Sequence, residues 1–525
     1  MSDNPSSSPQ PHCASYAPDA YPEAPNAPHS PTVDGSSTIK TSESDDLIPP
    51  THACRTLVLC FDGTGDQFDA DNSNIVQFFS MLQKDDPREQ MVYYQAGIGT
   101  YTIPQMVTPF YAKLSKTIDL MVGNHLDAHV MSGYEFLMQN YQAGDKICLF
   151  GFSRGAYTAR ALAGMLHKVG LLPPSNYQQV PFAYRMYTRD DHDGWKQSTV
   201  FKKAYSIDVD VEFVGVWDTV NSVGIIPRRL PFTKANNQIR FFRHALSLDE
   251  HRIRFMPSFY HRSTQADNEL GVQKGEMPRS VKKSRTGHNR YDQPQHDTSD
   301  WNGHHHELSP QDSECFCTQP ITQTNVDEVW FAGCHCDVGG GSVKNGARNS
   351  LARIPLRWMI REIFKAGVGI LFYRSMFQQI GMDPSSLHSP FDPRPPIIFN
   401  SPIKAGYVTP YQGNDEAIQC NPNGNFVNEE LEDLYDARSE IHDELTDTPY
   451  WWILEVLPQM MYYQREEDHQ LAKEIKVNMG KGRRVPKREP PKVHRTVQIR
   501  MAADDLPEGK YRPKAEMTAA PVWVD

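Results

Sequence analysis

Ser153 is the residue of this chain best suited to covalent chemistry, because it lies between Gly151 and Gly155 in a G-x-S-x-G motif. The apolar run 146–150 before the motif predicts a buried strand, and the alanine- and leucine-rich run 156–166 after it predicts a helix. A strand, a sharp turn and a helix are the setting in which this motif exposes a nucleophilic serine. The two glycines would let neighbouring backbones approach closely in a strained turn.

A serine nucleophile needs a histidine base and a carboxylate that orients it. In α/β-hydrolases, where this motif is typical, the three residues follow along the chain in the order Ser, then Asp or Glu, then His. Asp218 comes directly after the predicted strand 211–217, and His335 follows the predicted strand 326–333 with only Cys334 between them. Side chains at the carboxyl ends of strands lie where open α/β sheets bind ligands. We therefore expect His335 to be the general base for Ser153, and Asp218 to fix the tautomer of its imidazole.

The charge that develops on the substrate oxygen requires nearby N–H donors. Arg154, the residue after the nucleophile, would supply one backbone N–H. The second donor is expected from Gly63 or Thr64, in the exit loop of the predicted strand 57–61. Asp62, at the tip of that strand, would order the loop by accepting hydrogen bonds from backbone N–H groups.

A triple glycine at 339–341 follows His335 and predicts a flexible loop that lets the imidazole reach over the sheet. Asp337, in the same stretch, is expected to support the site. Three other histidines are rivals for the general base, the first two on a predicted helix start where structural contacts are expected: His244, His251 and His494.

Two metal-binding alternatives stay open beside the triad, although we expect neither a metal nor another cofactor. The aspartates of 62–71 could bind calcium or magnesium, but they lack the closing glutamate of a calcium loop. A solvated loop leading to a helix N-cap at Asn72 or Ser73 is favoured there. A zinc site around His335 would use cysteines whose spacing matches no common zinc signature: Cys315, Cys317, Cys334 and Cys336.

Five ordered motifs resemble those of the DUF2235 family, and the likeness covers about residues 53–375. The resemblance implies an α/β-hydrolase with a Ser-Asp-His triad that acts on esters. The family includes phospholipase effectors of bacterial type VI secretion, and the chain is most similar to its stand-alone fungal members. The first loop departs from the family pattern, since Gly65-Asp66 stand where a Trp and an Asn are common. The motifs are Phe61-Asp62-Gly63-Thr64-Gly65, Gly151-Phe152-Ser153-Arg154-Gly155-Ala156, Gly215-Val216-Trp217-Asp218-Thr219-Val220, Arg243-His244-Ala245-Leu246-Ser247-Leu248-Asp249-Glu250 and His335-Cys336-Asp337-Val338-Gly339-Gly340-Gly341.

The elements that must position these residues predict an α/β-hydrolase-like, mostly parallel sheet flanked by helices. We expect a disordered Pro/Ser-rich tail over 1–50 and a hydrolase domain over 53–400. A polar insertion over about 268–324 precedes the proposed base and is hypothesised to be a lid. Residues 401–525 are expected to form a C-terminal extension that caps the domain with helices.

Two stretches of the C-terminal extension allow two interpretations each. The aromatic run 450–463 is expected to be core of the cap, and its alternative is a lipid interface, where Trp and Tyr prefer to lie. The basic run 481–488 is expected to be a solvated loop, and its alternative is contact with anionic head groups.

The overall composition limits the functional classes. A formal net charge of -11 disfavours general nucleic-acid binding. The start of the chain lacks a signal-peptide pattern, and no stretch approaches 18 apolar residues. We therefore expect a cytoplasmic protein, with peripheral membrane contact as an option, whose partner is an ester or phospholipid substrate. A catalytically silent hydrolase fold that serves as a binding scaffold is the alternative.

Overall fold

The computed structural model divides the chain into two units, 1–42 and Glu43–Asp525. The first unit, and with it most of the predicted tail, lies outside the described residues, as does most of the predicted insertion and therefore the lid hypothesis. The residues described are 46–50, 52, 54–64, 66–97, 126–220, 239–273, 275–277, 321, 323–387, 394–399, 426, 428–465, 470–487 and 490–525.

Eight strands of the described residues form one sheet, in the order β12-β11-β7-β6-β5-β4-β2-β3. Every pairing within it is parallel, which confirms the predicted parallel α/β architecture. The predicted strands 57–61, 146–150 and 326–333 are present with ends shifted by one or two residues, 211–217 has the predicted ends, and the other four strands of the sheet were not predicted. The strands are β2 (Thr56–Phe61), β3 (Gln90–Gln95), β4 (Lys146–Phe152), β5 (Val211–Trp217), β6 (Ile239–Ser247), β7 (Asn325–Phe331), β11 (Lys492–His494) and β12 (Val522–Val524).

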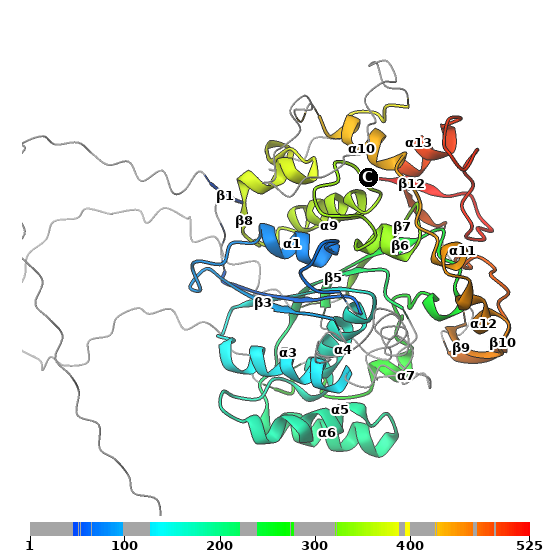
Figure 1. Ribbon diagram of the computed structural model, residues 1–525. Helices are drawn as coiled ribbons and strands as arrows, with labels where there is room; N and C mark the ends of the chain where they lie inside the picture. Colours follow the sequence, from blue (N-terminus) through cyan, green and yellow to red (C-terminus); the bar gives the residue numbers. More distant parts are fainter. Residues whose placement is uncertain are drawn as a thin grey trace, which may run out of the picture. The chain divides into compact units, whose positions relative to one another are not determined.

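Helices cover both faces of the sheet (Figure 1). Alternate residues of β2 enter different cores: Leu57 and Leu59 pack on one face, Val58 and Cys60 on the other. This burial on both sides explains why the strands read as continuous apolar runs. One face carries α3 (Leu126–Asn140), α4 (Ser153–Val169) and α5 (Val180–Thr188), with α6 (His192–Tyr205) packed on α4 and α5; the other carries α1 (Asn74–Met81) and α9 (Arg353–Lys365).

Shorter elements surround this framework. β1 (Leu47–Ile48) pairs with β8 (Phe372–Tyr373), so the last residues of the predicted tail are structured. Two further short helices are α7 (Gln265–Asn268) and α8 (His335–Gly339). Single 3₁₀ turns or short 3₁₀ helices span Tyr177–Gln179, Ile253–Phe255, Arg374–Ile380, Pro384–Leu387 and Pro449–Trp451.

The described part of the C-terminal extension holds four α-helices, and it also adds the strands β11 and β12 to the main sheet beside β7. A separate two-stranded sheet, β9 (Gln459–Gln464) with β10 (Leu471–Lys476), forms an antiparallel hairpin in the same region. The four helices are α10 (Glu429–Ala437), α11 (Glu444–Asp447), α12 (Trp452–Glu455) and α13 (Thr496–Ala502). No helix in the described ranges is long and apolar enough to cross a bilayer.

The strand order reverses at β2, which pairs with β3 on one side and with β4 on the other. In open α/β sheets, ligands bind outside the carboxyl ends of the strands at such a reversal. The residues that follow these two strands are Asp62 after β2 and Ser153 after β4. The topology therefore points to the same edge of the sheet as the sequence motifs.

Candidate active site

Ser153 is the first residue of α4 and follows β4 without a linker. Its φ is +58°, in the left-handed region that a non-glycine residue adopts only under strain. A Cβ on Gly155 would lie 2.2 Å from the carbonyl oxygen of Phe61, and one on Gly151 would lie 2.4 Å from that of Gly155. Both glycines are therefore required by close backbone contacts, and the turn presents the serine as a strained strand-to-helix elbow does.

Ser153, His335 and Asp218 form one buried chain of hydrogen bonds. The distance from Ser153 Oγ to His335 Nε2 is 2.8 Å, and that from His335 Nδ1 to Asp218 Oδ2 is 2.6 Å. Because a carboxylate only accepts, the hydrogen-bond network assigns the proton to Nδ1 and leaves Nε2 to accept from the serine hydroxyl. Asp218 directly follows β5 with a φ of +40°, and His335 begins α8.

Arg483 holds the other side of the Asp218 carboxylate. Its Nη1 and Nη2 donate to Oδ1 at 2.6 Å and to Oδ2 at 2.8 Å, and neither side chain is exposed to solvent. Nη1 also donates to the carbonyl of Ser247 at 3.0 Å, and Nη2 donates to that of Phe255. The prediction of a solvated loop over 481–488 is wrong at Arg483, which is buried. The physical reason is that the buried carboxylate of Asp218 needs a cation beside it.

The electrostatics of the site follow from burial and from these partners. Burial opposes ionisation of Asp218, but Arg483 and His335 outweigh it and hold the pKa of the carboxyl well below its usual range. Burial lowers the pKa of His335 below its ordinary value, although the hydrogen bond to Asp218 opposes this. At neutral pH the site therefore contains an aspartate anion and a neutral imidazole, the states in which a serine can lose its proton to Nε2.

Two aromatic rings contact the imidazole of His335. The ring centroids of Phe152 and Phe255 lie 4.7 Å and 4.8 Å from it. Arg252 stacks on Phe255 with its guanidinium carbon 3.7 Å from the ring centroid. Burial opposes ionisation of Glu250, but Arg252, which binds it through two nitrogens, lowers its pKa to about 2. The base is thus fixed in an apolar setting beside a second buried ion pair.

The glycines after His335 have a different role from the one predicted. The histidine begins a short helix and does not lie in a flexible loop. A Cβ on Gly339 would lie 1.8 Å from the Phe152 ring, and one on Gly340, whose φ is +83°, would lie 2.5 Å from the backbone nitrogen of Asn74. Close packing therefore explains two of the three glycines: Gly339 lies against the elbow, and Gly340 lies against the start of α1.

Asp337 fastens the start of α8. Its Oδ2 accepts from the backbone N–H of Cys334 at 2.9 Å, and its Oδ1 lies 2.7 Å from Nδ1 of His442. The residue thus connects the helix that carries His335 to the C-terminal extension, as a supporting residue would.

Asp62 orders the loop after β2. Its Oδ1 accepts from the N–H of Gly63 at 2.8 Å and from the hydroxyl of Ser73 at 2.6 Å, while Tyr94 donates to Oδ2 at 2.7 Å. Burial raises the pKa of Asp62, although these donors oppose the shift. Since the Gly63 N–H is already engaged, Thr64 is the remaining candidate of the two for a second oxyanion donor. Of Asn72 and Ser73, the two residues predicted as the helix N-cap, Ser73 is the one that caps α1.

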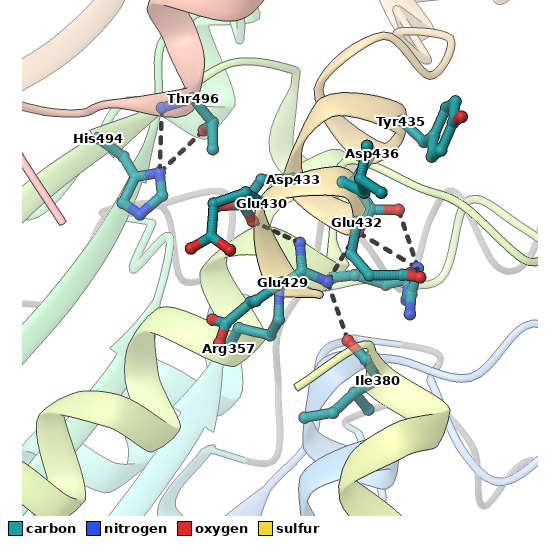
Figure 2. Close-up of polar contacts among 12 residues, drawn as sticks. Arg357, Ile380, Glu429, Glu430, Glu432, Asp433, Tyr435, Asp436, His494 and Thr496 are labelled. Carbon is teal, nitrogen blue, oxygen red and sulfur yellow. Dashed lines mark hydrogen bonds and ion pairs between the residues drawn. The ribbon is translucent and has the colours of Figure 1, made fainter. Parts of the chain in front are cut away.

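The rival histidines occupy other positions. His244 lies within β6, not at a helix start, and bonds the N–H of Thr219 and the carboxylate of Glu328. His251 lies in a loop, where its ring lies 2.9 Å from Asp443 Oδ1. Figure 2 shows His494 bonded to Thr496. The helix prediction was wrong for the first two, because β6 continues through Ser247 and His251 lies in the loop that follows it.

Both ring nitrogens of His335 are engaged by Asp218 and Ser153, which disfavours its use as a zinc ligand. Cys334 and Cys336 are free thiols, and Cys315 and Cys317 fall outside the described residues. Across the part of the chain that the structure describes, no group of three or more His, Cys, Asp or Glu side chains is arranged to hold a metal ion.

The parallel sheet and the serine at a strained strand-to-helix turn define an α/β-hydrolase-like protein. The chain belongs to the family described as "T6SS, Phospholipase effector Tle1-like, catalytic domain", which matches residues 55–362, more than half of its length. The predicted DUF2235 membership is thereby confirmed. The matched range ends before α10, so the residues around Arg483 lie beyond it.

Similar proteins include the uncharacterized protein YEL023C of Saccharomyces cerevisiae, which is 29% identical over 567 residues, covering 89% of this chain and 81% of that protein. An uncharacterized protein from Pseudomonas aeruginosa, known from its crystal structure, is 16% identical with a TM-score of 0.31, over 64% of this chain and 49% of that one. The Tle1 effector bound to the VgrG spike of the Type 6 secretion system is 15% identical with a TM-score of 0.26, over 59% and 58%. The chain thus spans about half the length of these two solved structures.

Proposed function

We propose that this protein is a serine hydrolase that cleaves carboxylic esters of lipids, with phospholipids as the substrate class. The observation that carries the proposal is the chain from Ser153 Oγ to His335 Nε2 and from His335 Nδ1 to Asp218, built on a serine with a φ of +58°. Membership in a phospholipase effector family supports the substrate class.

In the first half-reaction, Ser153 Oγ attacks the acyl carbonyl carbon while His335 Nε2 takes the hydroxyl proton. The tetrahedral intermediate collapses, the bond from carbon to the leaving oxygen breaks, and the imidazolium gives its proton to the leaving alcohol. Asp218 stabilises that imidazolium and keeps Nδ1 as the donor. In the second half-reaction, water takes the place of the alcohol and its oxygen attacks the acyl carbon while His335 Nε2 takes a proton from it. The bond from the acyl carbon to Ser153 Oγ then breaks, the imidazolium returns its proton to Oγ, and the acid is released.

The oxyanion of each tetrahedral intermediate would accept from the backbone N–H of Arg154 and from that of Thr64. Arg154 is the second residue of α4, so its N–H belongs to the positive end of a helix of 17 residues. The loop that carries Thr64 lies against the elbow, because a Cβ on Gly63 would be 2.7 Å from the Phe152 ring. Loss of one such donor typically raises the barrier by about 3 to 4 kcal/mol.

Arg483 acts through Asp218 as a positioning residue. Its two hydrogen bonds fix the plane of the carboxylate, and its charge keeps that carboxylate ionised in a buried site. The C-terminal extension would thus contribute to catalysis without touching the substrate.

The test is hydrolysis of a soluble short-chain ester and of a phospholipid by the wild type and by Ser153→Ala. We expect the wild type to release fatty acid and the variant to lose activity while its thermal unfolding is unchanged. Equal activity of the two proteins would refute the mechanism, and the absence of activity in both would favour a binding scaffold.

A further inference from the structure

The aromatic stretch predicted to be core is instead largely exposed. Six large apolar side chains of α12, of the turn after it and of the β9–β10 hairpin face solvent, and we call them the apolar patch: Trp452, Ile453, Val456, Leu457, Met460 and Ile475. The exposed fraction is 62% for Ile453 and 69% for Ile475. A cluster of this kind on a water-facing surface usually marks a site of contact with a partner or a membrane.

The segment that carries the apolar patch is anchored at its base, and the end of β9 is also held where Gln464 exchanges hydrogen bonds with the backbone of Arg262. Glu455, which is buried, accepts from the N–H groups of Ile253 and Gly480 and from the amide of Asn478, so both ends of the excursion meet at one point. Figure 1 shows α12 beside the β9–β10 hairpin. Within that hairpin Met460 stands opposite Ile475, which places their side chains on the same face.

The base of the apolar patch is linked to the candidate active site by two ring contacts. Trp451, the buried neighbour of Trp452, meets the Phe255 ring edge-on with centroids 5.6 Å apart. Phe255 in turn lies 4.8 Å from the imidazole of His335. A surface in contact with the apolar patch would therefore lie near the residue that we propose as the base.

The side chains around the apolar patch match the chemistry of a lipid surface. Tyr450 is exposed two residues before Trp452, and amphipathic rings of this kind prefer the boundary between head groups and acyl chains. Lys473 and Lys481 are exposed in this segment, although 456–487 as a whole is close to balanced: of its seven Lys and Arg, Arg483 is buried on Asp218, and the others are offset in the sequence by Glu466, Glu467, Asp468 and Glu474. Such cations favour anionic head groups.

We propose that the apolar patch docks this protein on a lipid bilayer, which brings ester substrate to the Ser153–His335 pair. The docking itself depends on the apolar patch, whereas the delivery of substrate rests on the proposed function. Insertion of apolar side chains supplies most of the binding, and the lysines add a contribution that salt screens.

The experiment is co-sedimentation of the full chain with vesicles of phosphatidylcholine, and with vesicles in which phosphatidylserine replaces part of it. Ser153→Ala is used as the background so that vesicles stay intact. We expect this protein to bind both kinds of vesicle, and the added pair Ile453→Glu and Ile475→Glu to reduce the bound fraction about tenfold. Val200→Glu is the matched control, since Val200 is 64% exposed on α6, and we expect it to bind normally.

A second measurement separates docking from folding and from catalysis. With Ser153 intact, the Ile453→Glu and Ile475→Glu variant should keep the wild-type kcat/KM on a soluble short-chain ester and lose activity on vesicles. Undiminished vesicle binding by that variant, or no binding by its parent, would overturn the docking surface. A solution dimer that the variant splits would also overturn it, since a second copy would then be the occupant. Vesicle binding by a wild type that cleaves no ester would support the docking surface and refute the proposed function.

Discussion

Arg483 and Asp218, which are 265 positions apart in the sequence, form a two-point ion pair that is closed to solvent, with both nitrogen-to-oxygen distances under 3 Å. The same carboxylate contacts His335 through Oδ2. A buried carboxylate with one neutral partner would be costly, so the guanidinium is what allows an ionised Asp218 at this position.

Substitution of Arg483 should therefore change catalysis and not stability alone. We expect Arg483→Met to lower kcat by about a hundredfold, the scale of a misplaced catalytic group. The acid limb of its kcat/KM profile should move to higher pH, because Asp218 loses the charge that holds its pKa down. Arg483→Lys should recover part of the rate, since it keeps the charge and loses the two-point geometry.

Arg500→Met is the matched control for this experiment. Arg500 is also fully buried in the C-terminal extension, where it donates to the carbonyls of Ala437 and Ser439. We expect that variant to lose stability and to keep the pH profile of the wild type. Equal pH profiles for the Arg483 and Arg500 variants would show that Arg483 is merely structural.

The pH dependence of the wild type should report His335. Burial lowers the pKa of its imidazole, so the neutral base form persists to more acidic pH than for an ordinary histidine. We expect kcat/KM on a soluble ester to be constant near neutrality and to fall on acidification, with its inflection below about 6.5. An inflection above pH 7 would contradict the lowered pKa.

Gly155→Ala should destroy the elbow. The new methyl group would lie 2.2 Å from the carbonyl oxygen of Phe61 and 2.4 Å from that of Asp62, and backbone at both positions cannot yield as a flexible side chain does. We expect loss of ester hydrolysis together with a lowered Tm, measured by activity assay and thermal unfolding.

Gly509→Ala is the control for that substitution, because Gly509 has a φ of +83° with no atom within 4 Å of the added Cβ. Its backbone strain should cost on the order of 1 kcal/mol and leave activity unchanged. Full activity in Gly155→Ala would show that the close contact at the elbow is not needed.

A buried ion-pair network joins α9 to α10 (Figure 2). Arg357 lies 2.7 Å from both Asp433 and Asp436, and all three side chains are buried. Removal of one partner leaves buried charges unpaired, so Arg357→Met should lower the free energy of unfolding by about 3 to 5 kcal/mol. Chemical denaturation measures this change. The exposed pair of Arg88 with Asp86 is the control, and Arg88→Met should leave the denaturation midpoint unchanged.

The same network should make stability depend on pH. Burial raises the pKa of Asp433, but Arg394 and Arg357 outweigh it, so the folded-state pKa lies below the unfolded one. Its contribution is therefore fully present above the unfolded value, near 4, and is lost as the pH falls towards the folded value. We expect Asp433→Asn to flatten the decline of stability below about pH 4; a decline as steep as that of the wild type would contradict this role.

The sequence predicted the parallel architecture and the strands before Ser153, Asp218 and His335, because each of those strands ends in a short apolar run; it did not predict β6, where a helix start was expected. Strands that are buried on both faces and run parallel bring the residues after them to one edge, so local patterns were sufficient there. The catalytic roles of these residues remain predictions, to be decided by the substitutions above.

The sequence could not predict contacts that depend on distant packing. Arg483 belongs to a basic run that looks solvated, and only the folded chain shows that it meets a carboxylate 265 residues away. The aromatic run 450–463 has the composition of a core segment, yet its hairpin pairs only with itself in the described residues and leaves much of the run exposed. Likewise the glycines after His335 suggested flexibility, although the Phe152 ring fills the space beside Gly339 and the backbone of Ser73 and Asn74 fills the space beside Gly340.

The most direct test of the central claim is labelling of the purified full chain with a fluorophosphonate, followed by mass spectrometric mapping of the modified residue. We expect a phosphonyl adduct on Ser153 in the wild type and no adduct in Ser153→Ala. In His335→Ala we expect labelling to be much slower than in the wild type. Because the site is buried, the reaction is run with and without detergent micelles. A wild type that stays unlabelled under both conditions, or one labelled at another serine, would contradict the claim that Ser153 is an activated nucleophile.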